Sequence, residues 1–314
     1  MSDNLVFMFS GQGSQYVGMG KELYENYEAA KEVLDKADQI MDFDLKDMIF
    51  NGPEEDLNNT KNTQPAIYTV SAMVKAVLAE NGITPAAAAG HSLGEYSALY
   101  AAGVLSFADG LKLVRRRGEL MDQADPEGKG TMAAVIGMAD QDVEAVLEKI
   151  DGIVTVANYN SPGQVVISGE VEAVSAAEEL LAEAGAKKVI SLSVSGAFHS
   201  PLMEPAKEDL KNTIEAIDFK DAQIPLIANV TADYVKESSE IKSALIKQLN
   251  NSVRWAESIE RFKEDGYEDY VEVGPGRVLK GLMRRIDRSL NAYNVEDEKS
   301  LNKTLKKLKS EGDE

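Results

Sequence analysis

The stretch that most constrains the fold runs from Ala86 to Ser97 and reads AAAAGHSLGEYS. Gly90 and Gly94 stand two residues before and two residues after Ser92, and glycine lets the backbone turn sharply where a Cβ would crowd its neighbours. This Gly-x-Ser-x-Gly pattern is typical of a nucleophile elbow, a tight turn between strand and helix that exposes a serine hydroxyl. An ordinary Gly/Ser turn in front of a buried helix is the alternative.

The residues after the turn favour the chemistry of such an elbow. From Leu93 to Ala102 the chain contains good helix formers and no proline. We therefore expect the backbone N–H of Leu93 at a helix N-terminus, directed to the place where a tetrahedral oxyanion would form. Together with the Ser92 hydroxyl, this arrangement favours serine acyl transfer.

A second glycine-containing loop follows the apolar run Leu5–Phe9, which is typical of a buried parallel strand. Gly11 and Gly13 flank Gln12 in this loop, so the backbone there can pass close to a ligand. Loops at the ends of buried strands are where α/β folds carry their sites. A tight turn without a ligand role is the alternative.

Composition limits the class of protein. The 314 residues are 44% hydrophobic and 27% charged, which indicates a globular chain long enough for a large core and a smaller unit. The absence of cysteine excludes disulfides, thiol catalysis and cysteine metal ligands. The formal net charge of -20 opposes general binding to nucleic acid or anionic membranes. Because neither a signal peptide nor an apolar run of about 18 residues is visible, we expect a cytoplasmic protein.

A change of pattern marks a smaller unit at residues 129–196. Its strands are predicted at 131–138, 153–158, 165–168 and 187–194, and its helices at 142–150 and 171–184. The order βαββαβ is that of a ferredoxin-like module, which can fold around its own small core. We therefore expect this unit to be inserted into a larger α/β domain formed by residues 1–128 and 197–314.

The larger domain is expected to contain a buried parallel sheet and helices. Its further strands are predicted at 86–90, 224–230 and 270–273, and its helices at 21–40, 64–81, 93–102, 107–123, 240–249 and 253–264. The strand 270–273 leads into a second strand, turn and helix unit at Gly274, and the tail after Asn294 is expected to form one peripheral helix.

One arginine is expected on a buried helix face. With Ser106 as N-cap, the helix at 107–123 carries an apolar stripe, and Arg117 falls within that stripe. Arg116 points to the opposite side and Arg115 lies near the edge, as in an ordinary solvated charge run. A buried arginine needs an anionic partner. A structural Asp or Glu and the carboxylate of a substrate, held by the planar guanidinium, are the two candidates.

The sequence contains two histidines, His91 and His199. A serine nucleophile needs a base within hydrogen-bond reach, and histidine takes and returns a proton best near neutral pH. An elbow directs the neighbour of its serine away from the nucleophile, so His91 is an unsuitable base. His199 is therefore the candidate base, and a hydrogen-bonded histidine before a turn proline is the alternative.

These motifs together carry a family resemblance. They are, in chain order, Phe9-Ser-Gly-Gln-Gly-Ser-Gln15, Gln64-Pro-Ala, Gly90-His-Ser-Leu-Gly-Glu95, Arg117-Gly118, Asn160-Ser-Pro-Gly-Gln-Val-Val166, Phe198-His199, Gln248-Leu249 and Val273-Gly-Pro-Gly276. In order and spacing they resemble the malonyl-CoA:acyl carrier protein transacylase family over nearly the whole chain. Ser10 and Ser252 stand where many members have proline, which alters local stiffness rather than chemistry.

The resemblance implies a fold, an activity and partners. The fold is an α/β-hydrolase-like core with a ferredoxin-like insertion. The activity is transfer of a malonyl group from malonyl-CoA to a serine and then to the phosphopantetheine thiol of acyl carrier protein, for fatty acid biosynthesis. We expect no metal or other cofactor, no nucleic-acid or membrane partner, and a monomer.

The resemblance also implies roles for individual residues. Ser92 matches the nucleophile, His199 the general base and Arg117 the group that binds the malonyl carboxylate. The backbone N–H groups of Gln12 and Leu93 match the oxyanion hole. A further set matches supporting positions: the backbone carbonyl of Gln248, which orients the histidine in place of an aspartate, and the pocket residues Gln64, Asn160 and Phe198.

Three functions compete at this stage: a transacylase, a hydrolase with water as acceptor, and a non-catalytic module that binds a carrier protein or acyl-CoA. The presence of both Ser92 and His199 argues against the last. A buried Arg117 favours the transacylase, because an ordinary esterase has no use for a buried cation. Phe198 resembles the malonyl-selective form of the motif, in which the ring crowds an α-methyl branch.

A cationic stripe is the candidate docking surface for the acidic carrier protein. On the helix after Gly276, helical spacing places Arg277, Lys280, Arg284 and Arg288 on one side, opposite Val278, Leu282, Ile286 and Leu290. Such a stripe would offset the repulsion between two acidic proteins. An ordinary solvated face paired with local carboxylates is the alternative.

Overall fold

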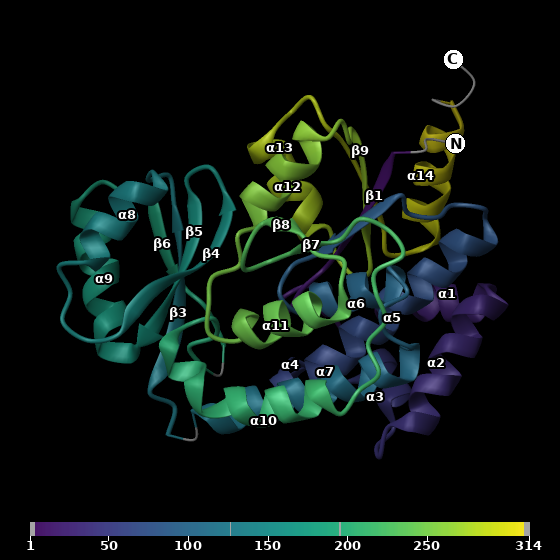
Figure 1. Cartoon of the computed structure of the whole chain (residues 1–314), viewed down its shortest axis with the longest axis horizontal. Coiled ribbons are helices and arrows are strands. Elements are labelled where there is room, and N and C mark those ends of the chain that lie inside the picture. Colours follow the sequence, from purple (N-terminus) through teal and green to yellow (C-terminus); the bar gives the residue numbers. More distant parts are fainter. Residues whose placement is uncertain (1–3, 126, 195, 311–314) are drawn as a thin grey trace.

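The computed structural model describes residues 4–125, 127–194 and 196–310, and its two main sheets lie on the two sides of Figure 1. The strands of the parallel sheet are, in spatial order, β10 (Asn291–Val295), β9 (Asp269–Val273), β1 (Leu5–Phe9) and β2 (Ala87–Gly90). Those of the antiparallel sheet are β4 (Val154–Ser161), β5 (Gln164–Glu170), β3 (Gly130–Ile136) and β6 (Lys188–Ser191). The predicted fold class, an α/β core with a parallel sheet and a smaller βαββαβ unit, is confirmed.

The smaller unit has the strand order of a ferredoxin-like module. Its first strand, β3, lies between the third and the fourth, β5 and β6, and all pairs are antiparallel. The helices α8 (Asp140–Leu147) and α9 (Val171–Glu183) lie on one side of this sheet and enclose a separate apolar core with it (Figure 1). The predicted bounds of the insertion, 129 and 196, stay a prediction.

Helices cover the parallel sheet and connect its strands. They are α1 (Lys21–Asn26), α2 (Glu28–Ile40), α3 (Leu45–Asn51), α4 (Glu54–Asn58), α5 (Thr60–Glu80), α6 (Leu93–Ala101), α7 (Phe107–Ala124), α10 (Glu204–Glu215), α11 (Ser238–Gln248), α12 (Trp255–Glu264), α13 (Val278–Ile286) and α14 (Glu298–Ser310). Leu5, Phe7 and Phe9 face one apolar core and Val6 and Met8 another, because successive side chains of β1 point to opposite faces. The sheet is thus buried on both sides, as its continuous apolar run predicts.

The parallel register places two loops side by side. Phe9 at the end of β1 pairs with Gly90 at the end of β2 and with Val273 at the end of β9. The loop that contains Gln12 and the turn that contains Ser92 therefore leave the sheet at the same edge. This edge is where parallel sheets carry their sites.

Two predicted elements of the larger domain differ from the structure. The helix expected at 21–40 is broken at Tyr27, whose extended backbone (φ -127°, ψ 119°) ends α1 and begins α2. The strand expected at 224–230 is reduced to β7 (Ile227–Ala228), because the chain turns back into a hairpin with β8 (Asp233–Tyr234). The hairpin ends the extended segment early.

Two further differences concern sheet edges. The strand expected at 187–194 is shortened to β6, because it pairs with β3 only from Lys188 to Ser191. The helix expected in the tail is confirmed as α14, but the sequence analysis did not predict β10, which precedes it. Both short strands take part of their stability from a neighbour far away in the sequence, which local patterns do not reveal.

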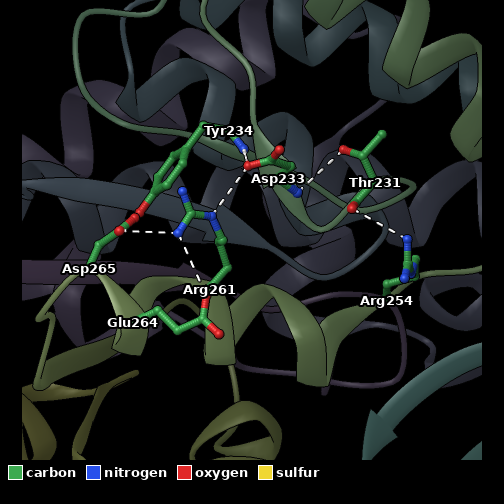
Figure 2. Close-up of polar contacts among 7 residues, drawn as sticks. All are labelled: Thr231, Asp233, Tyr234, Arg254, Arg261, Glu264 and Asp265. Atoms are coloured by element: carbon green, nitrogen blue, oxygen red, sulfur yellow. Dashed lines mark hydrogen bonds and ion pairs between the residues drawn. The ribbon is translucent and has the colours of Figure 1, made fainter.

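Polar contacts hold the β7–β8 hairpin against α12 (Figure 2). Arg261 contacts Asp233 at 3.4 Å, and Arg254 donates to the backbone carbonyl of Thr231 at 3.4 Å. The loop inside this hairpin contains Asn229, a buried residue that reaches the Ser92 turn. The contacts in Figure 2 therefore hold in place the hairpin whose loop contacts the Ser92 turn.

Candidate active site

The turn at Ser92 has the strained geometry of a nucleophile elbow. Ser92 has φ 51° and ψ -104°, a combination that non-glycine residues rarely adopt. A Cβ on Gly90 would overlap the backbone of Gly94, and a Cβ on Gly94 would overlap the backbone carbonyl of Phe9. Both glycines are therefore required by close approach, and the turn has the shape that the sequence pattern predicts.

The Ser92 hydroxyl and the His199 imidazole form a hydrogen-bonded pair, with 2.7 Å between Oγ and Nε2. On the other side of the ring, Nδ1 lies 2.8 Å from the backbone carbonyl oxygen of Gln248. A carbonyl can only accept, so Nδ1 carries the proton and Nε2 is free to accept from the serine. Burial, followed by the positive charge of Arg117, lowers the pKa of His199 to about 3. The imidazole is therefore a neutral base near neutral pH.

Arg117 lies directly behind Ser92 and is 1% exposed. Its Nη1 donates to Gln64 Oε1 at 3.0 Å, and its Nη2 donates to Gln248 Oε1 at 3.0 Å and to Ser92 Oγ at 3.1 Å. Within the described residues, no carboxylate forms an ion pair with this guanidinium. No Asp or Glu of the described residues therefore contacts Arg117 directly. Glu95 acts on it only at longer range, and the guanidinium is available to a ligand.

The neighbouring arginines behave differently. Arg115 and Arg116 both pair with Glu119 on the same helix, at 3.0 Å and 3.3 Å. Arg117 is thus the member of the run that points inward, as its place in the apolar stripe predicts. Arg117 is therefore buried, whereas Arg115 and Arg116 belong to an ordinary solvated charge run.

Two backbone N–H groups flank the serine. Leu93 is the first residue of α6, and Gln12 lies in the half-buried loop after β1. In the described parts of the chain, neither N–H donates a hydrogen bond to another protein group. Both are therefore available to a developing oxyanion.

A cavity of about 550 Å³ opens between the two sheets. Gln12, Ser92, Asn160, Phe198 and His199 line it, together with residues of the smaller unit such as Val166. Asn160 also accepts a hydrogen bond from His91 Nε2, at 2.7 Å, if that nitrogen carries the proton. The remaining predicted residues, Leu93, Gln64, Arg117 and Gln248, are buried behind this lining.

The predicted cationic stripe is partly wrong. α13 ends at Ile286, because Asp287 caps it and pairs with Lys263 of α12, so Arg288 lies in the turn beyond. Lys280 is half-buried and donates to Asn294 Oδ1 at 2.9 Å. Among the four cations, Arg277, Arg284 and Arg288 are exposed.

The opposite side of this helix also differs. Val278, expected on the buried side, is 53% exposed at the mouth of the cavity. The buried side consists of Leu279, Leu282 and Met283. Val278 is the first residue of α13, and Arg277 before it has non-helical backbone angles (φ -150°, ψ 37°), so the helical pattern holds only from Leu279 on.

The sequence analysis missed two buried polar residues that support the site. Glu95 accepts from the side chain of Gln248, and Asn229 Oδ1 accepts from the backbone N–H of Ser92. A charged residue inside the buried helix that follows the elbow could have drawn attention to Glu95. Asn229 has no comparable local signal.

Two general features follow from the described residues. They contain no group of three or more His, Cys, Asp or Glu side chains that could hold a metal ion. None of their helices combines the length and the apolar composition that a membrane crossing requires.

Comparisons with known proteins agree with this geometry. The family model described as "Acyl transferase domain" matches residues 6–310. The chain is 48% identical to a malonyl CoA-acyl carrier protein transacylase of Bacillus subtilis (strain 168), over 98% of each chain. It also resembles the crystal structure of the transacylase of that name from Clostridium perfringens, with 41% identity, a TM-score of 0.95 and 98% coverage of both chains.

A further solved structure shows a malonyl-transacylase in complex with a type II PKS acyl-carrier protein. It is 41% identical to this chain, with a TM-score of 0.94, and the match covers 97% of this chain and 99% of that one. With the family model matching nearly the full length, and with these identities, the chain belongs to the malonyl-CoA:acyl carrier protein transacylase family of acyl transferases.

Proposed function

We propose that this chain moves a malonyl group from malonyl-CoA to the phosphopantetheine thiol of acyl carrier protein, through an acyl-enzyme on Ser92, and so supplies fatty acid biosynthesis. The observation that carries the proposal is the pairing of the Ser92–His199 dyad with a buried arginine that has no carboxylate partner among the described residues. The printed names of the relatives support the donor and the acceptor. The reaction proposed here needs no metal or bound cofactor, and its proposed place is the cytoplasm.

In the first half-reaction, Ser92 Oγ attacks the thioester carbonyl while His199 Nε2 takes the hydroxyl proton. The carbonyl oxygen gains negative charge, which the N–H groups of Gln12 and Leu93 would stabilise. The C–S bond then breaks, and the proton on His199 passes to the departing coenzyme A sulfur. The malonyl group is left as an ester on Ser92.

The second half-reaction runs the same steps with a new thiol. The phosphopantetheine thiol gives its proton to His199 and attacks the ester carbonyl. The ester C–O bond breaks, and Ser92 Oγ recovers the proton from His199. With water in place of the thiol, the same steps would release free malonate, which is the hydrolase alternative.

Arg117 supplies the preference for malonyl. Its Nη2 lies 3.1 Å from Ser92 Oγ, so a carboxylate two bonds beyond the ester carbonyl can reach the guanidinium. Gln64 and Gln248 hold the guanidinium through neutral oxygens and leave its charge to the substrate. Phe198, in the cavity lining, would crowd a branched acyl group.

Steady-state kinetics with both substrates test this function. Initial rates measured at several concentrations of malonyl-CoA and holo carrier protein should give the parallel double-reciprocal lines of a ping-pong reaction. Malonyl carrier protein should be formed in large excess over free malonate. Intersecting lines would contradict the acyl-enzyme, and free malonate as the main product would favour the hydrolase.

A further inference from the structure

One buried carboxyl group has no part in the steps described above. Glu95, the third residue of α6, is 2% exposed, and no Lys or Arg of the described residues forms an ion pair with it. Its Oε2 accepts from Gln248 Nε2 at 2.8 Å and from the backbone N–H of Asn229 at 3.1 Å. A buried carboxylate without an ion pair is costly, so these two contacts are its main compensation.

The side-chain amide of Gln248 has two different ends, and its neighbours determine how it must lie. Arg117 can only donate, so it requires the Gln248 oxygen, which lies 3.0 Å from Nη2. The backbone carbonyl of Ser92 and the ionised Glu95 can only accept, so they require the amide nitrogen, at 3.0 Å and 2.8 Å. The opposite orientation would place donor against donor and oxygen against oxygen. Glu95 therefore helps to fix which end of Gln248 faces Arg117.

This arrangement keeps a negative charge near Arg117 without a direct ion pair. The guanidinium contacts a neutral amide oxygen, and the carboxylate lies on the other end of the same amide. A direct Glu–Arg pair would have to be broken before a substrate carboxylate could bind. Because Gln248 lies between Glu95 and Arg117, the place beside the guanidinium stays open for a substrate carboxylate.

Glu95 also supports the elbow through Asn229. The Asn229 side chain accepts from the Ser92 backbone N–H at 2.8 Å and donates to the Gly90 carbonyl at 2.7 Å. Loss of this support would disturb Ser92 itself and would affect every acyl substrate equally. Loss of the Gln248 contact would act on Arg117 and would affect malonyl transfer most.

We propose that Glu95 is a positioning residue for acyl-group selection, which fixes the Gln248 amide so that its oxygen holds Arg117 in place for the malonyl carboxylate. This inference rests on the proposed malonyl transfer and names a residue that sets its selectivity. Gln248 is the link through which Glu95 acts.

The test compares kcat/KM for malonyl-CoA and acetyl-CoA. Glu95→Gln preserves size but replaces a charged acceptor by a neutral one, so the contact that holds the Gln248 amide becomes weaker. We expect kcat/KM for malonyl-CoA to fall about tenfold, the scale of a hydrogen bond to a charged group, with a much smaller fall for acetyl-CoA. The matched control is Glu272→Gln, a carboxyl with 0% exposure that accepts from Leu279 and Lys280 and should leave the ratio unchanged.

A double-mutant cycle tests whether Glu95 acts through Gln248. Gln248→Met removes the amide and preserves the backbone carbonyl that contacts His199. In that background, Glu95→Gln should not lower the malonyl-to-acetyl ratio further. A further fall, an unchanged ratio in the folded single variant, or equal losses for both substrates would overturn the inference.

A measurement on the unaltered protein covers the case in which Glu95→Gln does not fold. Burial raises the pKa of Glu95 to about 7, and a protonated Glu95 can donate to the amide oxygen and permit the opposite orientation. The malonyl-to-acetyl ratio should therefore fall as the pH drops from 8.5 to 6. Of the charged or titratable groups facing Glu95, Arg117 stays charged over this range and Tyr96, with a pKa raised to about 12, stays neutral. Any protonation of His199 would slow the reaction of both substrates equally, so it does not change the malonyl-to-acetyl ratio.

A ratio independent of pH would then count against the inference. Two reference measurements, on the unaltered protein and on Arg117→Ala, distinguish a failure of this inference from a failure of the proposed function. If the unaltered protein shows no preference for malonyl-CoA, or Arg117→Ala does not remove that preference, the proposed function is wrong. If both hold and Glu95→Gln has no selective effect, the inference alone is wrong.

Discussion

The site has two halves that are built differently. The reaction half, Ser92 and His199, is held by the backbone through a strained elbow and the Gln248 carbonyl, and it opens into the cavity. The arginine half, Arg117 with Gln64 and the Gln248 side chain, is held by neutral amides and is closed from solvent. Under the proposed function, the reaction half acts on any acyl thioester, and the arginine half distinguishes one acyl group from another.

The largest effect should come from the reaction half. Ser92→Ala removes the nucleophile and should abolish both half-reactions, measured as coenzyme A release and as transfer to the carrier protein. Ser97→Ala is the control, because Ser97 is buried in the helix that follows Ser92 and its hydroxyl has no hydrogen-bond partner in the described structure. Substantial transfer by the Ser92 variant would assign the nucleophile elsewhere.

The base should matter nearly as much. His199→Ala should slow acylation and deacylation alike by about 10² to 10⁴, the usual range for general acid–base catalysis. Because the pKa of His199 is lowered to about 3, the neutral form is present above that pH, and the acylation rate should not fall through His199 between pH 8 and pH 5. Near-normal turnover of the variant, or a rate that follows a group with pKa 6.5, would contradict the assignment.

The arginine half should show its effect as selectivity. Arg117→Ala should reduce malonyl transfer by about 2 to 4 kcal/mol more than acetyl transfer, because only malonate carries a second carboxylate. Arg116→Ala is the control, since Arg116 pairs with Glu119 at the surface. Equal losses for both acyl groups would show that Arg117 has a structural role.

The smallest effect should come from the surface beyond the cavity. Changing the exposed Arg277, Arg284 and Arg288 to glutamate should slow association with the acidic carrier protein, by about tenfold at low salt, and should reduce the salt dependence of transfer. Acylation by malonyl-CoA should change much less. A parallel fall in both half-reactions would instead assign these cations to coenzyme A phosphates or to the fold.

The sequence alone predicts those site features whose residues lie close together in the chain. The glycines around Ser92 and the inward face of Arg117 are visible within one turn or one helix, and the structure has both features. Glu95 and Asn229 were missed because their contact joins residues 134 positions apart, which no local pattern records. The error at Arg288 has the same origin, since the end of α13 depends on a pair between Asp287 and Lys263 of another helix.

The most direct test of the central claim follows the malonyl group itself by mass spectrometry of the intact protein and its peptides. With malonyl-CoA alone, the peptide containing Ser92 should gain a malonyl group. After addition of holo carrier protein, that group should leave Ser92 and be found on the phosphopantetheine arm. An adduct on another residue, or loss of the Ser92 adduct to water while the carrier protein stays unmodified, would contradict the account.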